Sequence, residues 1–353
     1  QDDKVCRIGD SAFGIILQDV TSPVLLQLAA EKINRLYSAA ISEMDVSFQA
    51  KVCIGIASYP DHANDAKELL HNARLAAEAA DSKGEPYLFY SPESVATLSM
   101  KWDIQADLAS AIESNALALF YQPKVSIATG RVIGAEALLR WDNGEYGPVP
   151  PDVFIPVACD IGMINELSQY VLTTALRNAA EWPRTGERQS ISINLESETL
   201  QDTEVDEIIS SSLSIWGSDH IDLLLEITES ALVADSKSNF RRLQSLRSMG
   251  VGISIDDFGT GYSSLSYFTN IPATELKIDK SFINDMLECG RSRSLVETII
   301  NLAHRFDLVV VAEGVEHPEE LNVLAEMNCD VAQGFHIAEA MSHDDYCHWL
   351  KKQ

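Results

Sequence analysis

The chain has 353 residues, of which 46% are hydrophobic and 22% are charged, so it is long enough for two domains with sizeable cores. Its 53 acidic and 26 basic residues give a net charge of −27, and no basic stripe interrupts them, which argues against a duplex nucleic-acid binder. No apolar run approaches the roughly 18–20 residues of a membrane helix, and the first residues, QDDKVCR, do not resemble a signal peptide.

Six cysteines are scattered through apolar segments and form no CxxC pair: Cys6, Cys53, Cys159, Cys289, Cys329 and Cys347. This usage predicts reduced, mostly buried thiols and no disulfide framework, as is typical of a cytosolic protein. We therefore expect a cytoplasmic location, with membrane contact only through segments outside this chain.

Residues 1–92 show an α/β pattern with few strands. The predicted elements are, in order, a strand at 13–18, a helix at 23–40, a strand pair or one long strand at 48–60, a helix at 64–81 opened by Asn64 or Asp65, and a strand at 87–93. So few strands indicate part of a domain. Residues 93–118 are mostly helical and join the two halves.

From residue 106 onward, short apolar runs alternate regularly with helical stretches. The runs lie at 117–123, 132–140, 190–196, 222–229, 252–258, 275–280, 308–316 and 330–335. The helical stretches lie at about 163–182, 201–214, 235–249, 291–306 and 317–328. Eight runs interleaved with helices predict an α/β fold, a (βα)8 barrel of mostly parallel strands.

Nearly every apolar run ends in a polar residue. These residues are Glu136, Asn194, Glu226, Asp256, Asp257, Lys277, Glu313, Glu316 and Gln333. Each of them alone is most simply a surface, turn or capping residue. In a barrel, however, the carboxyl ends of the strands converge on one face, and so many carboxylates need cations to stay ionised together. The joint pattern favours a site with two divalent metals, which would also polarise a phosphodiester.

The segment DFGTGYSSL at 257–265 follows the run that ends in adjacent aspartates. Its two glycines, small hydroxyl residues and tyrosine are compatible with a loop that closes over the metals. An ordinary turn is the alternative, and composition alone favours the turn.

Seven segments occur in the chain in the order in which one known family has them: YQPKVSIATGRVIGAEALLRW (121–141), SINLE (192–196), LLLEITES (223–230), ISIDDFGTGYSSL (253–265), LKIDKSF (276–282), VVAEGVEHPEEL (310–321) and AQGF (332–335). Over roughly residues 106–353 the chain resembles the EAL family of cyclic di-GMP phosphodiesterases, with Glu136-Ala137-Leu138 as the naming motif. The resemblance implies a modified TIM-type barrel whose first strand is antiparallel. It also implies hydrolysis of cyclic di-GMP to linear pGpG, and a homodimer formed through the barrel.

The resemblance further implies a role for each matching residue. One Mg²⁺ or Mn²⁺ ion would be held by Glu136, Asn194, Glu226 and Asp256, and a second by Asp256, Asp257 and Glu316. Lys277 would orient the attacking water and stabilise charge on the phosphoryl oxygens. Glu313 would act as general base or position the hydroxide, and Asp257 is counted with these two among the catalytic residues.

Other matching positions would support the substrate. Gln122, Leu138, Arg140 and Gln333 correspond to ligand-contacting positions, and Glu229 would anchor the loop at 257–265. Two departures affect fine substrate contacts only. Cys159 stands near a common glutamate, and GFHIAEAMS (334–342) lacks the usual proline-rich ending.

The segments RIGDSAFGIIL (7–17) and VCIGIASYP (52–60) resemble the second half of a GGDEF diguanylate cyclase domain. The signature is degenerate, because Ser11 and Ala12 replace both expected acidic residues. We therefore predict no cyclase activity, and a role in regulation or dimerisation, or none beyond that of a remnant. The expected organisation is a partial, degenerate GGDEF-like domain at 1–92, a linker helix at 93–105 and an EAL barrel at 106–353.

Two alternatives to an active phosphodiesterase stay open. A catalytically inactive member would bind cyclic di-GMP and relay the signal to a protein partner, and a scaffold would use only its acidic surface. Inactive receptors typically lose metal ligands or the 257–265 loop, whereas this chain retains all of them. The intact set favours the enzyme.

Overall fold

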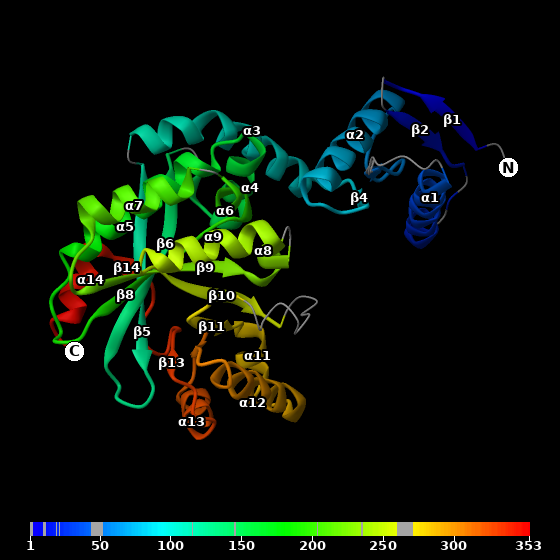
Figure 1. The fold of residues 1–353 in the computed structure, drawn as a ribbon. Coiled ribbons are helices and arrows are strands. Elements are labelled where there is room, and N and C mark those ends of the chain that lie inside the picture. Colours follow the sequence, from blue (N-terminus) through cyan, green and yellow to red (C-terminus); the bar gives the residue numbers. More distant parts are fainter. Residues whose placement is uncertain are drawn as a thin grey trace. The chain divides into compact units, whose positions relative to one another are not determined.

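The computed structural model describes residues 3–9, 12–18, 20, 22–43, 52–114, 116–144, 146–202, 204–233, 236–259 and 271–353. The chain divides into two compact units, Gln1–Ile104 and Gln105–Gln353. Figure 1 shows the first in blue to cyan and the second, which contains a barrel, in the remaining colours. Among the described residues, none of the helices combines the length and the apolar character that a membrane span requires.

The first unit contains two small sheets. Strands β1 (Lys4–Arg7) and β2 (Phe13–Ile16) form an antiparallel hairpin, whose turn is closed by N–H groups of residues 8 and 9 donating to the carbonyl of Ala12. Strands β3 (Ile54–Ile56) and β4 (Tyr87–Phe89) are parallel. The strand predicted from residue 48 is thus shorter, and its residues 48–51 lie outside the described part, as do Asp10 and Ser11 of the degenerate signature.

Two helices accompany these sheets, α1 (Pro23–Glu43) and α2 (Ala66–Ser82). Asp65 is the N-cap of α2, because its side chain accepts a hydrogen bond from the backbone N–H of Glu68. Helix α2 crosses β3 so closely that a Cβ atom on Gly55 would lie 1.9 Å from the carbonyl oxygen of Ala73. Glycine is therefore required where the helix meets the strand.

The second unit is a closed eight-stranded barrel. Its strands are β5 (Leu117–Ser126), β6 (Val132–Asn143), β8 (Gln189–Asn194), β9 (Ile221–Thr228), β10 (Gly252–Phe258), β11 (Glu275–Ile278), β12 (Val309–Ala312) and β13 (Val331–Ala332). Strand β5 pairs antiparallel with both β6 and β13, and every other pair around the barrel is parallel. The predicted modified barrel with an antiparallel first strand is confirmed. Short strands β7 (Gly147–Val149) and β14 (Met341–Ser342) add to β6 and β5.

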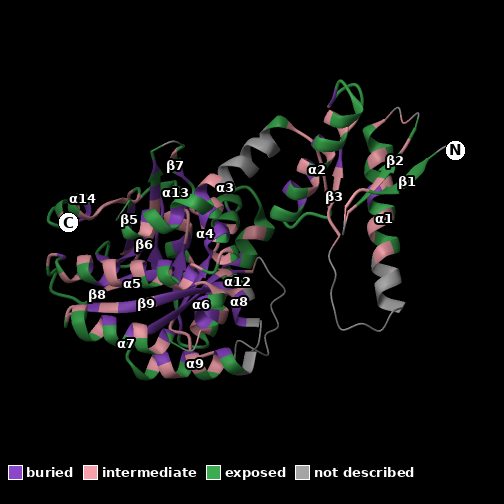
Figure 2. Cartoon of the chain, turned by 90° about the horizontal axis from the view of Figure 1, so that it is seen from above, coloured by how far each residue is buried: buried purple, intermediate pink, exposed green. Residues whose placement is uncertain are grey.

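Helices surround the barrel: α3 (Pro92–Glu113), α4 (Pro151–Asp160), α5 (Ile164–Ala180), α6 (Ser197–Gln201), α7 (Val205–Trp216), α8 (Glu229–Val233), α9 (Ser236–Ser248), α11 (Lys280–Asp285), α12 (Gly290–His304), α13 (Pro318–Glu326) and α14 (His343–Leu350). Figure 2 shows buried strands inside and exposed outer helix faces. Helix α4 was not predicted, because it contains Pro156 in its interior, which normally argues against a helix.

The cysteines are all free, as predicted. The expectation that most are buried was wrong: Cys329 is buried, Cys6 and Cys289 are exposed, and the other three are half-buried. Cys6 lies on strand β1 of a two-stranded hairpin, and Cys289 is the N-cap residue of helix α12. At such positions apolar neighbours in sequence do not lead to burial.

Candidate active site

Polar side chains from adjacent strands meet at the carboxyl ends of the barrel strands. Asn194 at the end of β8 lies opposite Glu226 on β9, and Asp256 on β10 lies opposite Thr228 at the end of β9. Glu136 reaches the same group from β6, where its side chain bonds that of Asn194. Parallel strands with matched registers thus bring together residues that are far apart in sequence.

The ammonium group of Lys277, on β11, lies at the centre of these side chains. Its Nζ atom is 2.6 Å from Glu226, 3.3 Å from Glu136, 3.4 Å from Asp256 and 2.5 Å from Glu313. Only 1% of the lysine side chain is exposed. Four carboxylates therefore contact one ammonium in a region with little water, where electrostatic interactions are strong.

The charges divide unequally among the carboxylates. Burial opposes ionisation of Glu226, but Lys124 and Lys277 together lower its pKa to about 2. Burial raises the pKa of Glu313 to about 8, assisted by the neighbouring carboxylates and opposed by Lys277. Burial also disfavours the charged form of Lys277, yet Glu136 and the other carboxylates raise its pKa well above the ordinary value. Neighbouring carboxyl groups with pKa values so far apart are typical of functional sites.

A second charged layer lies beneath the first. The Nζ atom of Lys124, on β5, donates to Ser192 at 2.7 Å, to Glu226 at 2.8 Å and to Glu275 at 2.9 Å. Ser254 also donates to Glu275, at 2.9 Å. The sequence interpretation missed this layer. Its signal was present, because Ser192, Ser254 and Glu275 each stand two positions before a predicted site residue, and alternate residues of a strand share a face.

Amide side chains line the rim of the site. The Nδ2 group of Asn194 donates to Oε1 of Glu136 at 2.8 Å, and the Nε2 group of Gln333 donates to Oε2 of the same carboxylate at 2.7 Å. Gln333 also donates to Gln122 at 3.0 Å. Among the described residues, the buried Oε1 atom of Gln333 has no hydrogen-bond partner. The structure thus brings Gln122 and Gln333 directly to the naming motif.

Asp257 stands at a strained point of the backbone. Its φ is 55°, which is uncommon for a residue other than glycine, and the register between β10 and β11 shifts between Ile255 and Phe258. Two residues later, the N–H of Gly259 donates to Oε2 of Glu229 at 3.1 Å. This contact joins the predicted anchor to the start of the predicted loop. Residues 260–265 of that loop lie outside the described part.

Three predicted residues within the described part are not among the side chains that contact Lys277, although Glu136 acts electrostatically on one of them, Arg140. Leu138 and Arg140 are half-buried on β6, and the Arg140 guanidinium lies 5.9 Å from the ring centre of Phe120 and donates to the carbonyl of Leu139. Glu316 is exposed, and its backbone N–H donates to the side chain of Glu320. The structure therefore does not place Glu316 within the carboxylate group around Lys277.

A divalent cation matches the donor set in chemistry. Within the described ranges, no three histidine, cysteine, aspartate or glutamate side chains are arranged to hold an ion as they stand, and Lys277 lies among the carboxylates. The donors are nevertheless carboxylate and amide oxygens, which suit Mg²⁺ and Mn²⁺. Four carboxylates around one ammonium also leave negative charge for a cation to neutralise. An ion bound here would take over contacts that Lys277 now makes.

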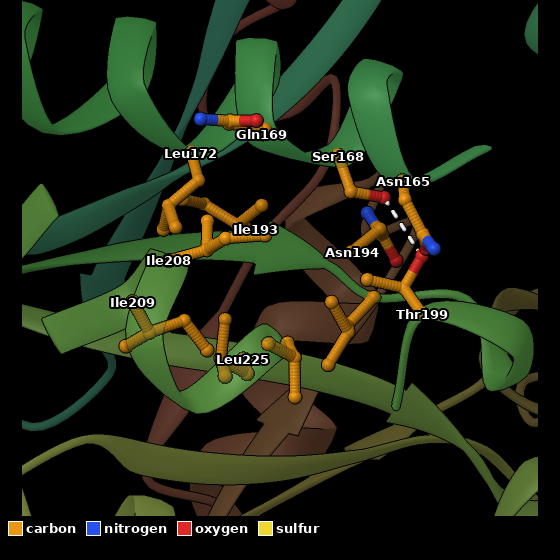
Figure 3. A pocket seen from close by; sticks show the side chains of 12 residues that line it. Asn165, Ser168, Gln169, Leu172, Ile193, Asn194, Thr199, Ile208, Ile209 and Leu225 are labelled. Atoms are coloured by element: carbon orange, nitrogen blue, oxygen red, sulfur yellow. Dashed lines mark hydrogen bonds between the residues drawn. The ribbon is translucent and has the colours of Figure 1, made fainter. Parts of the chain in front are cut away.

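A small pocket of about 20 Å³ lies on the other side of β8, between that strand and helices α5 and α7 (Figure 3). Its wall is mostly apolar and includes Leu172, Ile193 and Ile209. Asn194 reaches its edge, and Ser168 bonds Thr199 across it at 3.1 Å. A space of this size holds about one water molecule, so it is a packing gap behind the site, too small for a nucleotide.

Two family descriptions match the chain. That of the EAL domain matches residues 105–340, and that of the diguanylate cyclase GGDEF domain matches residues 1–86. The oxygen sensor protein DosP of Escherichia coli is 35% identical over 99% of this chain and 44% of its own length. The bifunctional diguanylate cyclase/cyclic di-GMP phosphodiesterase MucR of Pseudomonas aeruginosa is 35% identical over 96% of this chain and 50% of its own. The chain thus spans about half the length of the curated relatives it matches.

Solved structures match much of the chain. The PaMucR phosphodiesterase in complex with c-di-GMP is 37% identical, with a TM-score of 0.66 over 69% of this chain and 99% of that one. The EAL enzyme Bd1971, bound to cAMP and cyclic di-GMP, is 27% identical, with a TM-score of 0.67 over 82% of this chain and 77% of that one.

Proposed function

Because the chain belongs to the EAL domain family, with a GGDEF-family match at its N-terminus, we propose that it hydrolyses cyclic di-GMP to linear pGpG with the help of Mg²⁺ or Mn²⁺. One observation carries the proposal. Lys277, four carboxylates and the rim amides form one group at the carboxyl ends of the barrel strands, where barrel enzymes have their active sites.

In this proposal the carboxylates and amides hold the cations. Glu136, Asn194, Glu226 and Asp256 would bind one ion, and Asp256 with Asp257 would bind a second. Glu316 would be a further ligand of the second ion, which it would approach from the exposed rim of the site. Bound cations at such a site lower the pKa of water and polarise a phosphoryl oxygen. The ionised state of Glu226, with a pKa of about 2, suits a permanent ligand.

The remaining charged residues would act on the reacting groups. Burial raises the pKa of Glu313 to about 8, and the positive charge of bound cations would favour its ionised form, which would accept the proton of the attacking water. Lys277 would place positive charge where negative charge develops on the phosphoryl oxygens. In-line attack by the water then breaks one phosphodiester linkage, and the departing ribose oxygen takes up a proton. Gln122, Leu138, Arg140 and Gln333 would contact or support the nucleotide.

The first unit receives a different role in the proposal. Of its degenerate signature, Ala12 stands where an acidic residue is expected, so we propose no cyclase activity and a regulatory or dimer-forming function. A cytoplasmic location and a homodimer through the barrel belong to the same proposal. The mass of the protein in solution by light scattering tests the dimer.

Turnover is the decisive experiment. Purified protein is incubated with cyclic di-GMP and Mg²⁺ or Mn²⁺, and pGpG is sought by chromatography, with Glu136→Ala as the comparison. Product from the wild type and none from the variant is expected. Tight binding without product would instead support an inactive sensor that relays the signal to a partner, and absence of binding would support a scaffold. The close contact of Lys277 with Glu313 favours the enzyme over both.

A further inference from the structure

In the charged layer beneath the candidate site, the Lys124 ammonium uses all of its hydrogen-bond donors. The three N–H groups of the Lys124 ammonium are directed to three acceptors, on Ser192, Glu226 and Glu275. The side chains of Lys124 and Glu226 are fully buried, and that of Glu275 is 6% exposed. A buried ammonium with all its donors used has a single, fixed position.

The strand directions explain how this layer comes to lie under the site. Glu275 precedes Lys277 by two residues on β11, so both point into the barrel, with Glu275 one step farther from the strand end. Lys124 comes from β5, the one strand that runs the other way, and it is two residues from Gln122, which lies opposite Glu136. The lower layer therefore places Lys124 and Glu275 directly beneath Glu136 and Lys277 of the site, so that groups of opposite charge adjoin.

Glu226 belongs to both layers. Its Oε1 atom accepts from Lys124 at 2.8 Å, and its Oε2 atom accepts from Lys277 at 2.6 Å. The two ammonium groups approach the two oxygens separately, which fixes the rotation of the carboxylate about its last bond. One oxygen is turned to the interior and the other to the site.

We propose that Lys124 is a positioning residue that holds Oε1 of Glu226 toward the barrel interior and so presents Oε2 to the metal site, while Glu275 is the counter-charge that keeps Lys124 in place. The inference rests on the proposed function, because it concerns a ligand of the proposed metal site. Lys124 reaches neither substrate nor reacting atoms in this role and acts through Glu226 alone.

Replacing Lys124 alone would remove the ammonium that Glu275 contacts and one of the two that Glu226 contacts, which destabilises a protein whatever the role of the lysine. The test therefore compares Glu275→Gln with the double variant Lys124→Met and Glu275→Gln. The double variant removes one positive and one negative charge, and methionine keeps much of the lysine's length. The two proteins differ only in whether the Lys124 ammonium contacts Oε1 of Glu226, since Lys277 contacts Oε2 in both.

Three quantities are measured for both variants and the wild type: the melting temperature, the dissociation constant of Mn²⁺ from the electron paramagnetic resonance of the free ion, and kcat and KM for cyclic di-GMP. Relative to Glu275→Gln, the double variant should bind Mn²⁺ about 10-fold or more weakly and lose about 10-fold or more in kcat, as removal of a residue that orients a metal ligand does. KM should change little. The melting temperature should fall, because Oε1 of Glu226 loses a fully buried charged partner, so Mn²⁺ affinity and kcat are measured well below that temperature.

Equal Mn²⁺ affinity and kcat in the two variants would overturn the inference while leaving the proposed function in place. If the double variant binds Mn²⁺ more weakly than Glu275→Gln but the wild type forms no pGpG, the inference is supported and the proposed function is overturned. No Mn²⁺ binding by the wild type would overturn both. If the methionine variant does not fold, Lys124→Gln with Glu275→Gln replaces it. That variant keeps a neutral donor, and its Mn²⁺ affinity and kcat should fall in the same direction by a smaller factor.

Discussion

The Nζ atom of Lys277 lies 2.5 Å from the Oε1 atom of Glu313, a contact between strand β11 and the residue that follows strand β12. Each group therefore affects the pKa of the other. Lys277 favours the charged form of Glu313, while burial and three other carboxylates oppose it. This pair is the part of the site from which acid–base chemistry is most directly expected.

Glu313→Gln tests that expectation. Glutamine keeps the size of the side chain but accepts no proton, so kcat should fall by about 10²–10⁴-fold, the usual contribution of a general base. Binding of cyclic di-GMP in the presence of Ca²⁺, measured by calorimetry, should change little. Glu326→Gln is the control, because that carboxylate is 70% exposed and pairs with an exposed arginine. Full activity of Glu313→Gln would remove Glu313 from the mechanism.

Glu229 should control turnover through the backbone at Gly259. Glu229→Ala removes the acceptor of the 3.1 Å bond from the Gly259 N–H, and a bond to a charged acceptor contributes about 1.5–3 kcal/mol. We expect kcat to fall by about 10-fold or more, measured by pGpG formation. Glu229→Gln keeps an acceptor oxygen and should lose less. The same rate for both variants and the wild type would contradict the anchoring role.

The stability of the metal-free protein should depend on pH through Glu313. Its pKa is about 8 in the folded protein against an ordinary value of 4.5, so between these values the folded chain holds a proton that the unfolded chain has lost. The free energy of unfolding therefore falls as the pH rises through this window, by at most about 1.4 kcal/mol per pH unit for one group.

Urea denaturation of chelator-treated protein between about pH 5 and pH 8 measures this slope. Glu313→Gln lacks the titrating group, so its stability should fall less steeply than that of the wild type across the same range. Parallel curves for the two proteins would show that Glu313 has an ordinary pKa.

Gly134 should be required for the contact between β6 and β8. A Cβ atom at this position would lie 2.2 Å from the carbonyl oxygen of Ser190, the residue opposite it in the ladder. Gly134→Ala should therefore destabilise the protein by about 1–3 kcal/mol, as overpacking does, and lower the melting temperature. Gly144→Ala is the matched control, because no atom lies within 4 Å of its added Cβ. Equal melting temperatures would show that the strands can separate at no cost.

Much of the barrel could be predicted from the sequence because its strands are short apolar runs with a polar residue at one end. Asp256 illustrates why the pattern is informative, since it follows a fully buried and uncharged stretch of β10. Helix α4 could not be predicted this way, because Pro156 conceals a helix that the surrounding packing tolerates.

The lower layer shows where the sequence is insufficient. Lys124 stands in an amphipathic strand in which a lysine is ordinarily solvated, and its burial depends on β5 running against its neighbours. Glu275 appears in sequence as the polar start of a strand, yet it is 5% exposed. Such pairs can be predicted only when the register of strands far apart in the chain is known. Likewise, the motif that contains Glu316 did not predict its exposure, because the path of the loop after β12 determines where this side chain lies.

The antiparallel strand β5 also sets the order in which the barrel can assemble. Its second edge is covered by β13 at 331–332 and β14 at 341–342, which lie about 200 residues farther along the chain, so these pairings form after those of the other strands as the chain leaves the ribosome. Lys124 likewise lacks its partner Glu275 until that residue, 151 positions farther along the chain, has been synthesised. The nascent protein consequently carries an open sheet edge and an unmatched ammonium in its future core, and it becomes resistant to aggregation and proteolysis only when translation of this region is nearly complete.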